Sequence, residues 1–498
     1  MAAAERFPPH LLAQPPADRL AYFAAKVVAH PRLKHTHLAV LNTVREPAGA
    51  SLILVIGPTG VGKTTLRLRL EQQLIERALP ELERDPGRLP VVALEAAAPE
   101  SGQFNWKDYY TRALLALEEP LIEHKIDHAL RGNGHHGTGR VRIERSTAAA
   151  DLRRALEECL CQRRVAVVIV DEAQHLKRLT SGRRLLDQMD TLKSLAALSG
   201  TVHVLVGTYE LLGLADLSAQ LSRRSVVIHF GRYHAEVAED LLAFKSVLLT
   251  FQRHLPLAAE PDLLGHWEEF YERSAGCVGV LKNWLQRGLA AALEAGASTL
   301  DRQHLERHAA STRTLLSLAR ESTEGEAALV QTDRERDELR LLLGLEIEPK
   351  ALPAATSNGL GASRSTGMAP RCPPVELPSD ARRAIQSAMG GWSMRADELT
   401  VYEGWDLARP PIPPRSRLFS LEPVGIGTPG VESLTGYVAR LATTHGVLVR
   451  RLVEDEILPL LGRSYLLGPG HTGGSSSFRP PCSCTSRGSI PAPVGSPP

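Results

Sequence analysis

The sequence predicts an α/β fold in which a parallel sheet is sandwiched between helices. Five short apolar runs alternate with segments of helical periodicity, and turn residues bound each run. Parallel strands are buried on both faces and are joined by crossover helices, so this alternation favours a parallel sheet. The expected strands are residues 51–56, 90–94, 165–170, 202–206 and 226–230.

Helices are expected between and after these strands. Pro31 breaks an N-terminal helical lead-in over residues 1–50, and Pro80 would end the first helix of the sheet domain. The sheet and its helices are assigned to residues 51–234, and residues 235–320, which hold no strand-like run, to a small all-α lid. The helices expected inside the sheet domain are residues 64–79, 104–125 with a break near Pro120, 148–160 and 185–197.

Length and composition favour a soluble protein of several domains. The 498 residues predict about three domains. Lys and Arg number 58 and Asp and Glu 56, a balance of +2 that excludes a polybasic protein, so any contact with nucleic acid must come from local patches. Six cysteines exclude a secreted disulfide scaffold. No secretory signal or membrane-spanning run is visible, so we expect a cytoplasmic location and no membrane contact.

A glycine-rich loop follows the first expected strand. Residues 57–64 (GPTGVGKT) match G-x-x-x-x-G-K-[ST] between a strand and a helix, the context of a phosphate-binding loop. Its glycines let backbone N–H groups surround phosphates, and the helix N-terminus adds positive potential. Lys63 would contact the β- and γ-phosphates of ATP, and the Thr64 hydroxyl would bind Mg²⁺. The expected nucleotide-binding residues here are Gly57, Pro58, Thr59, Gly60, Val61, Gly62, Lys63, Thr64 and Thr65.

An acidic pair follows the third expected strand. Ligands bind at the carboxyl ends of parallel strands, which places Asp171 and Glu172 beside the phosphate-binding loop. Asp171 would hold Mg²⁺ and complete the nucleotide site, and Glu172 would polarise the attacking water. Phosphoryl transfer depends mostly on positioning and charge neutralisation, so one metal-binding acid and one water-orienting acid suffice.

Four further residues are candidates for sensing the nucleotide. Thr208, after the fourth strand, can contact the γ-phosphate or the lytic water, or it can simply cap the next helix. Arg223 and Arg224 precede the fifth strand, where ring- or filament-forming ATPases carry an arginine finger; the alternative is a solvated basic pair. Lys282, in the helical lid, is a candidate second sensor.

Residues 15–315 resemble the AAA+ ATPases of the TniB/TnsC type, which regulate transposons with a DDE transposase. The resemblance implies an ATPase that forms a nucleotide-dependent homo-oligomer, a ring or filament, on double-stranded DNA. It would bridge target selection to the transposase, leave DNA on hydrolysis, and be a bacterial, nucleoid-associated protein. It also implies that Thr208 is the first sensor and that Arg223 or Arg224 is the finger. The motifs that carry it are GPTGVGKTT (57–65), FNWKDYY (104–110), VDEAQHL (170–176), LDQMDTLKSLA (186–196), VLVGTYELL (204–212), QLSRRSVVIHFGRY (220–233) and GCVGVLKNWL (276–285).

The rest of the chain changes in composition. Residues 321–393 are expected to be a helix followed by a linker rich in Pro, Gly and Ser. Residues 394–465 resemble the N-terminal part of TniQ, the target-selection partner of these ATPases, through PPIPPRSRLFSLEPVGIGTPGVESLTGYVARLA (410–442). Residues 466–498 are low-complexity sequence expected to be disordered. The TniQ-like segment is either a natural fusion or a read-through or frameshift product. Met394 could be the start of a separate protein in the second case.

Two basic clusters are candidates for DNA contacts. Cations lining the channel of an oligomer would bind phosphates without reading sequence, although each cluster could equally be a solvated helix face. The basic residues are Lys177, Arg178, Arg183 and Arg184 in one cluster and Arg140, Arg142 and Arg145 in the other.

Two other functions remain open for the protein as a whole. One is a secretion- or signalling-type ATPase, and the other is a nucleotide-gated scaffold with negligible turnover.

Overall fold

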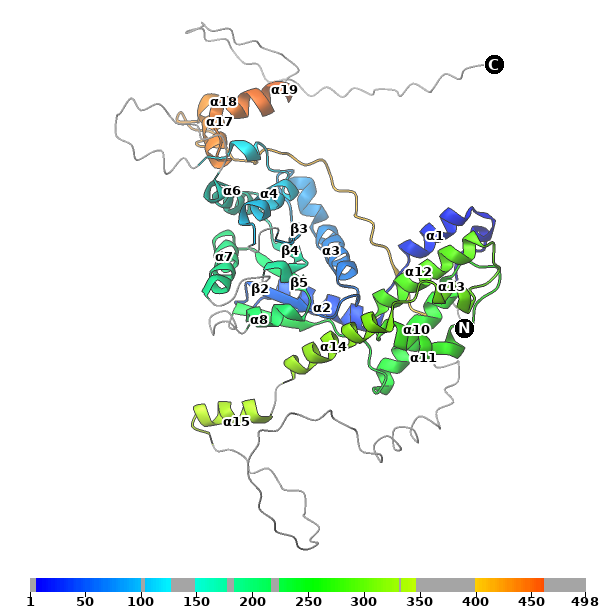
Figure 1. The fold of residues 1–498 in the computed structure, drawn as a ribbon. Coiled ribbons are helices and arrows are strands. Elements are labelled where there is room, and N and C mark those ends of the chain that lie inside the picture. The colour runs from blue at the N-terminus through cyan, green and yellow to red at the C-terminus, as the bar shows by residue number, and fades with distance from the viewer. Residues whose placement is uncertain are drawn as a thin grey trace, which may run out of the picture. The chain divides into compact units, whose positions relative to one another are not determined.

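A five-stranded parallel sheet lies at the centre of the first of two compact units, residues 1–449 (Figure 1). The strand order is β3-β4-β5-β2-β6, and each of the five predicted strands is confirmed to within two residues at its ends. The strands are β2 (Leu52–Ile56), β3 (Val91–Glu95), β4 (Val167–Asp171), β5 (Val202–Gly207) and β6 (Ser225–His229). The computed structural model describes residues 6–99, 104–126, 148–176, 183–215, 224–330, 333–345 and 399–460.

The register of the sheet gathers the carboxyl ends of its strands at one edge. Ile56, the last residue of the central strand β2, pairs with Gly207 of β5 and with His229 of β6. Asp171, the last residue of β4, pairs with Glu95 of β3. The residues that follow β2, β4, β5 and β6 therefore share one side of the sheet, where the sequence placed the nucleotide.

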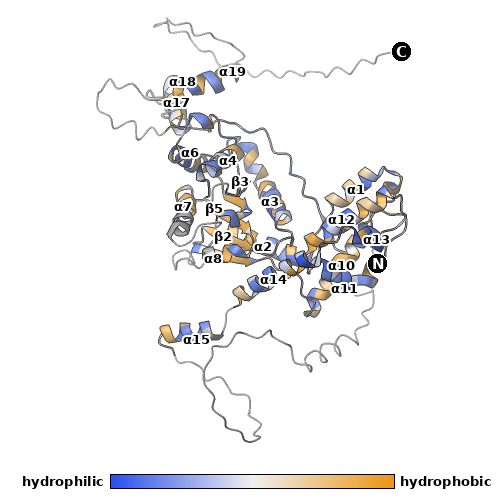
Figure 2. Cartoon of the chain, viewed as in Figure 1, coloured by the Kyte–Doolittle hydropathy of each residue, from blue (hydrophilic) through white to orange (hydrophobic). Residues whose placement is uncertain are grey.

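Helices cover both faces of the sheet, as predicted. Alternate strand residues such as Ile53, Ile169 and Val204 form one buried cluster with α2 and α3, and α6 and α7 lie on the other face (Figure 1). The strands are largely apolar, although β3 and β4 end in Glu95 and Asp171, whereas the helices carry mixed surfaces (Figure 2). The helices of this domain are α2 (Pro31–Arg45), α3 (Lys63–Arg84), α4 (Trp106–Ala116), α6 (Ala149–Gln162), α7 (Arg183–Ser199) and α8 (Leu212–Ala215), with the 3₁₀ turns η2 (Ile122–His124), η3 (Ala173–Leu176) and η4 (Tyr209–Leu211).

Two prolines act differently from the expectation. Pro80 was expected to end the first helix of the sheet domain, but α3 continues past it to Arg84. A proline removes one helical hydrogen bond, and here the turn beyond it is held by Arg415, whose guanidinium donates to the carbonyls of Leu82 (2.5 Å) and Asp85 (2.9 Å). Pro31 was expected to break the lead-in helix, but that helix already ends at Ala25; Pro31 lies in the first turn of α2, where its missing N–H costs nothing, so it begins a helix.

The helical lid predicted after the sheet is present, and it includes a helix from the N-terminal segment. Helix α1 packs against α12, and Phe23 of α1 is fully buried in the apolar cluster of the lid. The lead-in is therefore partly built into the lid. The elements are η1 (Pro9–Ala13), α1 (Pro16–Ala25), α10 (Ala238–His254), η5 (Leu264–His266), α11 (Trp267–Ser274), α12 (Val278–Glu294) and α13 (Arg302–Glu306).

Two helices follow the lid. Helix α14 (Thr312–Leu329) returns to the sheet domain and contacts η4, the turn after β5. Its residue Gly325 is buried directly against the ring of Tyr209, with no room for a Cβ atom. Helix α15 (Asp333–Leu342) comes next and carries several exposed leucines. The part of the chain that was expected to be a helix before a linker therefore contains two helices.

The C-terminal segment over residues 399–449, here called the strap, packs onto the sheet domain. Its strand β7 (Gly404–Trp405) pairs antiparallel with β1 (Val27–Val28), and its helix α17 (Leu434–Thr444) precedes His445. Glu119 and Lys125 of the sheet domain meet His445 in a fully buried cluster, here called the strap seat. Residues 399–449, which make up most of the segment expected to be TniQ-like, are thus part of the first compact unit.

The second compact unit, residues 450–498, is described only over residues 450–460. The turn α18 (Val449–Arg451) leads into a π-helical stretch, Leu452–Ile457, and then α19 (Leu458–Leu460). Ion pairs join Arg450 to Glu454 and Arg451 to Asp455 along this helix. Among the residues that the structure describes, none of the helices has both the length and the apolar composition needed to cross a bilayer.

Candidate nucleotide-binding site

The phosphate-binding loop connects β2 to α3 and is shaped by its glycines. Gly60 and Gly62 have φ angles of +79° and +117°, the left-handed region in which side chains other than glycine are strained. A Cβ atom on Gly60 would also collide with the side chain of Val280, at the start of α12. Val280 N donates to Gly60 O at 3.2 Å, so the lid helix rests directly on the loop.

Lys63 is buried within this loop. It is the first residue of α3, and its Nζ donates to Gly57 O (3.0 Å) and Pro58 O (2.8 Å). Burial lowers the pKa of Lys63, while the charges of Glu172 and Asp171 act in the opposite direction. The ammonium group is thus placed among polar but neutral carbonyl groups, with two carboxylates close enough to influence it electrostatically. Phosphate oxygens would give this cation stronger partners.

Asp171 and Glu172 lie where β4 ends. Asp171 is 5% exposed, and its Oδ1 accepts a hydrogen bond from the backbone N–H of Glu172 at 3.0 Å. Glu172 has a φ of +52°, a left-handed conformation that costs a non-glycine residue roughly 1–2 kcal/mol. Strain of this kind is tolerated where the surroundings fix the residue.

Gln174 connects this acid to the end of β5, a link that the sequence reasoning missed. Its amide Nε2 donates to the Glu172 carboxylate, and its Oε1 accepts from the backbone N–H of Thr208 at 3.3 Å. The available signal was the position of Gln174 in the sequence DEAQ, two residues after Glu172. The bridge holds the proposed water-orienting acid and the proposed first sensor in one geometry.

Thr208 does not behave as a helix cap. It precedes η4, but its side chain makes no capping hydrogen bond, and its Oγ1 is buried without a partner among the described residues. An unpaired buried hydroxyl is unfavourable unless a ligand supplies the missing hydrogen bond. This is consistent with the sensing role and not with the capping alternative, although the role itself stays a prediction.

Arg67 is a second residue that the sequence reasoning missed. It lies one helical turn after Lys63, with its Nε 3.2 Å from Asp171 Oδ2 and its Nη1 3.5 Å from Glu71 Oε2. The acid expected to bind Mg²⁺ is therefore paired with a cation from α3. The only sequence signal was that Arg67 lies one helical turn after Lys63. That spacing places the two residues on the same side of α3, but it does not show that the Arg67 side chain reaches Asp171 at the end of β4.

Lys282 is engaged elsewhere. It lies on α12, and its Nζ donates to Ala24 O of α1 at 2.7 Å, while burial lowers its pKa. The α12 residues that abut the loop are Gly279 and Val280 instead; a Cβ on Gly279 would lie 2.5 Å from Gly60 O. The structure thus gives Lys282 a lid-bracing contact, and its sensing role stays a prediction.

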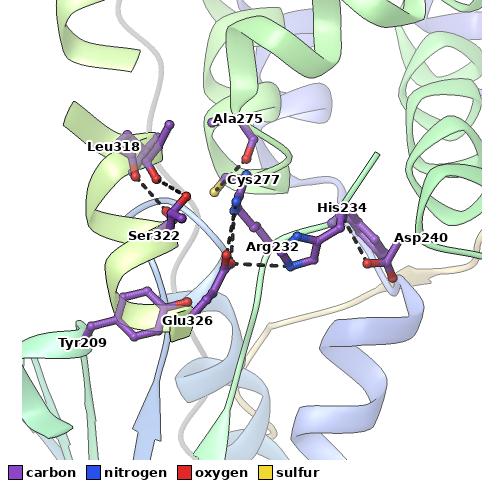
Figure 3. Close-up of polar contacts among 12 residues, drawn as sticks. Tyr209, Arg232, His234, Asp240, Ala275, Cys277, Leu318, Ser322 and Glu326 are labelled. Atoms are coloured by element: carbon purple, nitrogen blue, oxygen red, sulfur yellow. Dashed lines mark hydrogen bonds and ion pairs between the residues drawn. The ribbon is translucent and has the colours of Figure 1, made fainter. Parts of the chain in front are cut away.

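Helix α14 borders the same edge of the sheet (Figure 3). Arg232, three residues after β6, donates to the Glu326 carboxylate at 3.0 and 3.1 Å, and His234 lies 3.5 Å from the same carboxylate. Tyr209 packs beside this pair and its hydroxyl is 2.9 Å from His229 Nε2. Helix α14 therefore contacts the segments that follow both β5 and β6.

The remaining candidates are only partly described. Arg224 is exposed at the start of β6, and Arg223 lies outside the described residues. Of the candidate DNA contacts, Arg183 and Arg184 are the first two residues of α7. Those that lie outside the described residues are Arg140, Arg142, Arg145, Lys177 and Arg178.

Comparison with known proteins gives one family match and several remote structural likenesses. Residues 45–214 match the family described as AAA domain. No curated protein matches the chain. Similar solved structures include ORC2 of Aeropyrum pernix in ADPNP–ADP complexes (16% identity, 63% of this chain and 73% of that chain, TM-score 0.38) and Cdc6p of Pyrobaculum aerophilum (16%, 58% and 70%, 0.39). Another is the RuvB branch migration motor of Thermotoga maritima (14%, 64% and 84%, 0.28).

These likenesses are remote in sequence and low in TM-score, so the assignment depends on the family match and on the geometry. The match covers β2 to β5, the phosphate-binding loop and both acids after β4. Residues 45–214 are thus similar to the AAA domain family, and the parallel sheet with its flanking helices has the P-loop AAA+ fold.

Proposed function

We propose that the protein binds ATP with Mg²⁺ at the phosphate-binding loop and hydrolyses it to ADP and phosphate. The observation that carries the proposal is the placement of Lys63, which is 8% exposed and is held at the loop by two carbonyl oxygens beside a pair of acids. Burying an ammonium group is costly, and a triphosphate would supply the compensating charge.

The surrounding residues fit Mg²⁺ and a triphosphate. Magnesium prefers oxygen ligands, and the Thr64 hydroxyl and Asp171 carboxylate supply them. When bound, Mg²⁺ would neutralise charge on the β- and γ-phosphates. Lys63 would exchange its carbonyl partners for phosphate oxygens, and Glu172, braced by Gln174, would orient the attacking water. The unpaired Thr208 hydroxyl would donate to the γ-phosphate or the water.

The biological role we assign is ATP-dependent regulation of DNA transposition. In this role the protein oligomerises on double-stranded DNA, connects a TniQ-type target-selection protein to a DDE transposase, and leaves DNA after hydrolysis. The support is the ordered set of motif blocks, above all residues 170–176, 204–212 and 220–233, together with the AAA domain. Arg223 and Arg224 are the candidates for a finger that would act on a neighbouring copy.

Binding and hydrolysis are tested first. Lys63→Ala should abolish measurable binding of ATP with Mg²⁺, and Glu172→Gln should keep binding while slowing hydrolysis by about 10²-fold or more. Lys107→Ala and Glu83→Gln are matched controls, since Lys107 is exposed on α4 and Glu83 is exposed at the end of α3 opposite to the loop. Calorimetry and phosphate release measure the two quantities. Wild-type protein without affinity for ATP would refute the proposal.

The role on DNA needs a separate experiment. Electron microscopy of the purified protein with duplex DNA should show rings or filaments with a non-hydrolysable ATP analogue and none with ADP. Duplex DNA should also stimulate hydrolysis. ATP turnover that is indifferent to DNA would favour a secretion- or signalling-type ATPase, and nucleotide-dependent assembly without turnover would favour a scaffold.

A further inference from the structure

The strap reaches the helix that begins at Lys63. Trp405 anchors it there: its ring centroid lies 5.1 Å from that of His37 on α2 and 5.1 Å from the guanidinium carbon of Arg69 on α3. Leu407 packs against the buried cluster of the sheet. Two residues further along, Arg409 extends toward α3, and its Nη2 lies 2.5 Å from Glu71 Oε1.

Arg409 is the outer end of a row of alternating charges that leads into the nucleotide site. Glu71 is also paired with Arg67 (3.5 Å), and Arg67 in turn lies 3.2 Å from Asp171 Oδ2. The four side chains come from the strap, from α3 twice, and from the end of β4. The row therefore runs from a solvent-exposed arginine to the acid expected to bind Mg²⁺.

The inner charges of the row are more buried than the outer one, so their electrostatic interactions are stronger. The side chains of Glu71 and Asp171 are 6% and 7% exposed, and that of Arg67 is 20% exposed, whereas Arg409 is 62% exposed. Arg67 lies between two nearly buried carboxylates, so both of them attract its guanidinium group. A change in either carboxylate alters how strongly Arg67 holds the other.

We propose that this row sets the affinity of the nucleotide site for Mg²⁺, with Arg67 as a built-in competitor for Asp171 and with Glu71 and the strap residue Arg409 as positioning residues that tune it. The inference rests on the proposed function, since it requires that Asp171 take part in a Mg²⁺–ATP site. It adds that the C-terminal strap acts on that site through charge.

The row predicts effects of opposite sign. Without the charge of Arg409, Glu71 draws Arg67 more strongly, which leaves Asp171 freer, so Mg²⁺ should bind more tightly. Without the charge of Glu71, Arg67 pairs with Asp171 alone, so Mg²⁺ should bind more weakly. Simple loss of structure would weaken Mg²⁺ binding in both variants, so the signs separate the proposal from a structural role.

The experiment measures Mg²⁺ dependence of nucleotide binding in the full chain. A ribose-labelled fluorescent ATP analogue is held below saturation, MgCl₂ is titrated, and the Mg²⁺ midpoint is recorded; binding in EDTA gives the metal-free reference. Arg409→Gln should lower the midpoint by about threefold, a small effect because its charge is largely solvated, and high salt should remove it. Glu71→Gln should raise the midpoint by about tenfold.

Two controls and a double variant complete the test. Arg417→Gln and Glu83→Gln remove the same charges from exposed positions on the strap and on α3, and should leave the midpoint unchanged. In the Glu71→Gln background, Arg409→Gln should cause no further shift, because it acts through Glu71. If Glu71→Gln does not fold, the test is the Mg²⁺ midpoint of Arg409→Gln compared with that of Arg417→Gln, and only the first should be lowered.

The outcomes distinguish this inference from the proposed function. If the wild-type protein binds the analogue but Arg409→Gln leaves its midpoint unchanged, or moves it in the direction of Glu71→Gln, the charge row does not tune the site and only this inference falls. If the wild-type protein binds the analogue neither with Mg²⁺ nor in EDTA, the proposed function fails and this inference fails with it.

Discussion

Helix α14 and the strap both hold on to the sheet domain from outside it, but by different physical means. The strap is fixed by the strap seat, where Glu119 Oε1 lies 2.6 Å from Lys125 Nζ and 2.8 Å from His445 Nδ1, with all three side chains no more than 1% exposed. Lys125 also donates to the backbone carbonyl of His445 at 2.8 Å, and the ring of Phe419 stacks on that of His445. Every partner lies inside the protein.

The contact of α14 is more open. The side chains of Arg232 and Glu326 are 15% and 16% exposed, His234 lies 3.5 Å from the same Glu326 carboxylate, and Gly325 packs against Tyr209. The segments it touches follow β5 and β6, on the edge of the sheet that carries the nucleotide site. Water can replace these partners when α14 moves, whereas opening the strap seat would strand a buried charge. We therefore expect the strap to remain in place and α14 to respond to nucleotide.

The largest effect should come from breaking the strap seat. Glu119→Gln leaves Lys125 buried without its carboxylate, which costs about 3–5 kcal/mol of unfolding free energy. It should also free the strap, so hydrogen exchange over residues 434–447 should accelerate. Urea unfolding and exchange measured by mass spectrometry check both effects. Glu123→Gln, at an exposed position nearby, is the control, and equal stability of the two variants would show that the seat is not an anchor.

The seat also shows why the sequence predicted the sheet but not its attachments. Strands and the phosphate-binding loop are local patterns: an apolar run of five or six residues, or eight residues of fixed spacing, is enough. Glu119 and His445 are separated by 326 positions, and nothing in the residues around either one indicates the other. Arg415 likewise supports the turn after Pro80 from 333 positions away, which is why the expected end of that helix was wrong.

The same reasoning applies within the nucleotide site. Lys63, Asp171 and Glu172 could be placed from motifs because strand ends in a parallel sheet share an edge. Arg67 and Gln174 could not, because their roles depend on where long side chains extend after folding. Lys282 was expected near the nucleotide from its position in the lid, but the carbonyl of Ala24 on α1 takes its hydrogen bond. The sequence alone did not indicate that α1 packs there.

Acid should separate the two attachments. Burial lowers the pKa of His229; the charges of Arg32 and His234 lower it further, and that of Glu326 opposes them. Neutral His229 therefore stabilises the folded state fully above about pH 6.5, and this contribution is lost as the pH falls below that value. Burial alone would raise the pKa of Glu119, but His445 and Lys125 outweigh it, and the lowered pKa keeps the seat intact until the pH falls below about 4.5.

Between about pH 6.5 and about pH 4.5, the contact of Tyr209 with His229 and α14 should weaken, while the strap should stay bound to the sheet domain. The slope is about 1.4 kcal/mol per pH unit for one titrating group. Hydrogen exchange at about pH 5.5, corrected for the intrinsic rate and compared with about pH 7, should show faster exchange in residues 312–329 than in residues 434–447. Simultaneous loss of both regions would contradict the distinction.

A steric change tests the α14 contact directly. Gly325→Ala places a methyl group against the ring of Tyr209, and overpacking of this kind costs about 1–3 kcal/mol. Alanine favours the helix itself by about 1 kcal/mol, so α14 should stay helical while separating from η4. Exchange should rise in residues 209–211 with little change in the strap. Thr323→Ala, exposed on the same helix, should leave exchange there unchanged.

The smallest effect should come from Glu326→Gln. It removes the charge paired with Arg232 but keeps a side chain that can still accept a hydrogen bond, and the partial exposure of both groups lets water compensate. The expected loss is about 1 kcal/mol by urea unfolding, well below that of Glu119→Gln. A loss as large as at the strap seat would mean that α14 is as firmly built into the fold as the strap. In that case the contrast drawn from burial would not hold, and α14 would be no better placed than the strap to follow nucleotide binding.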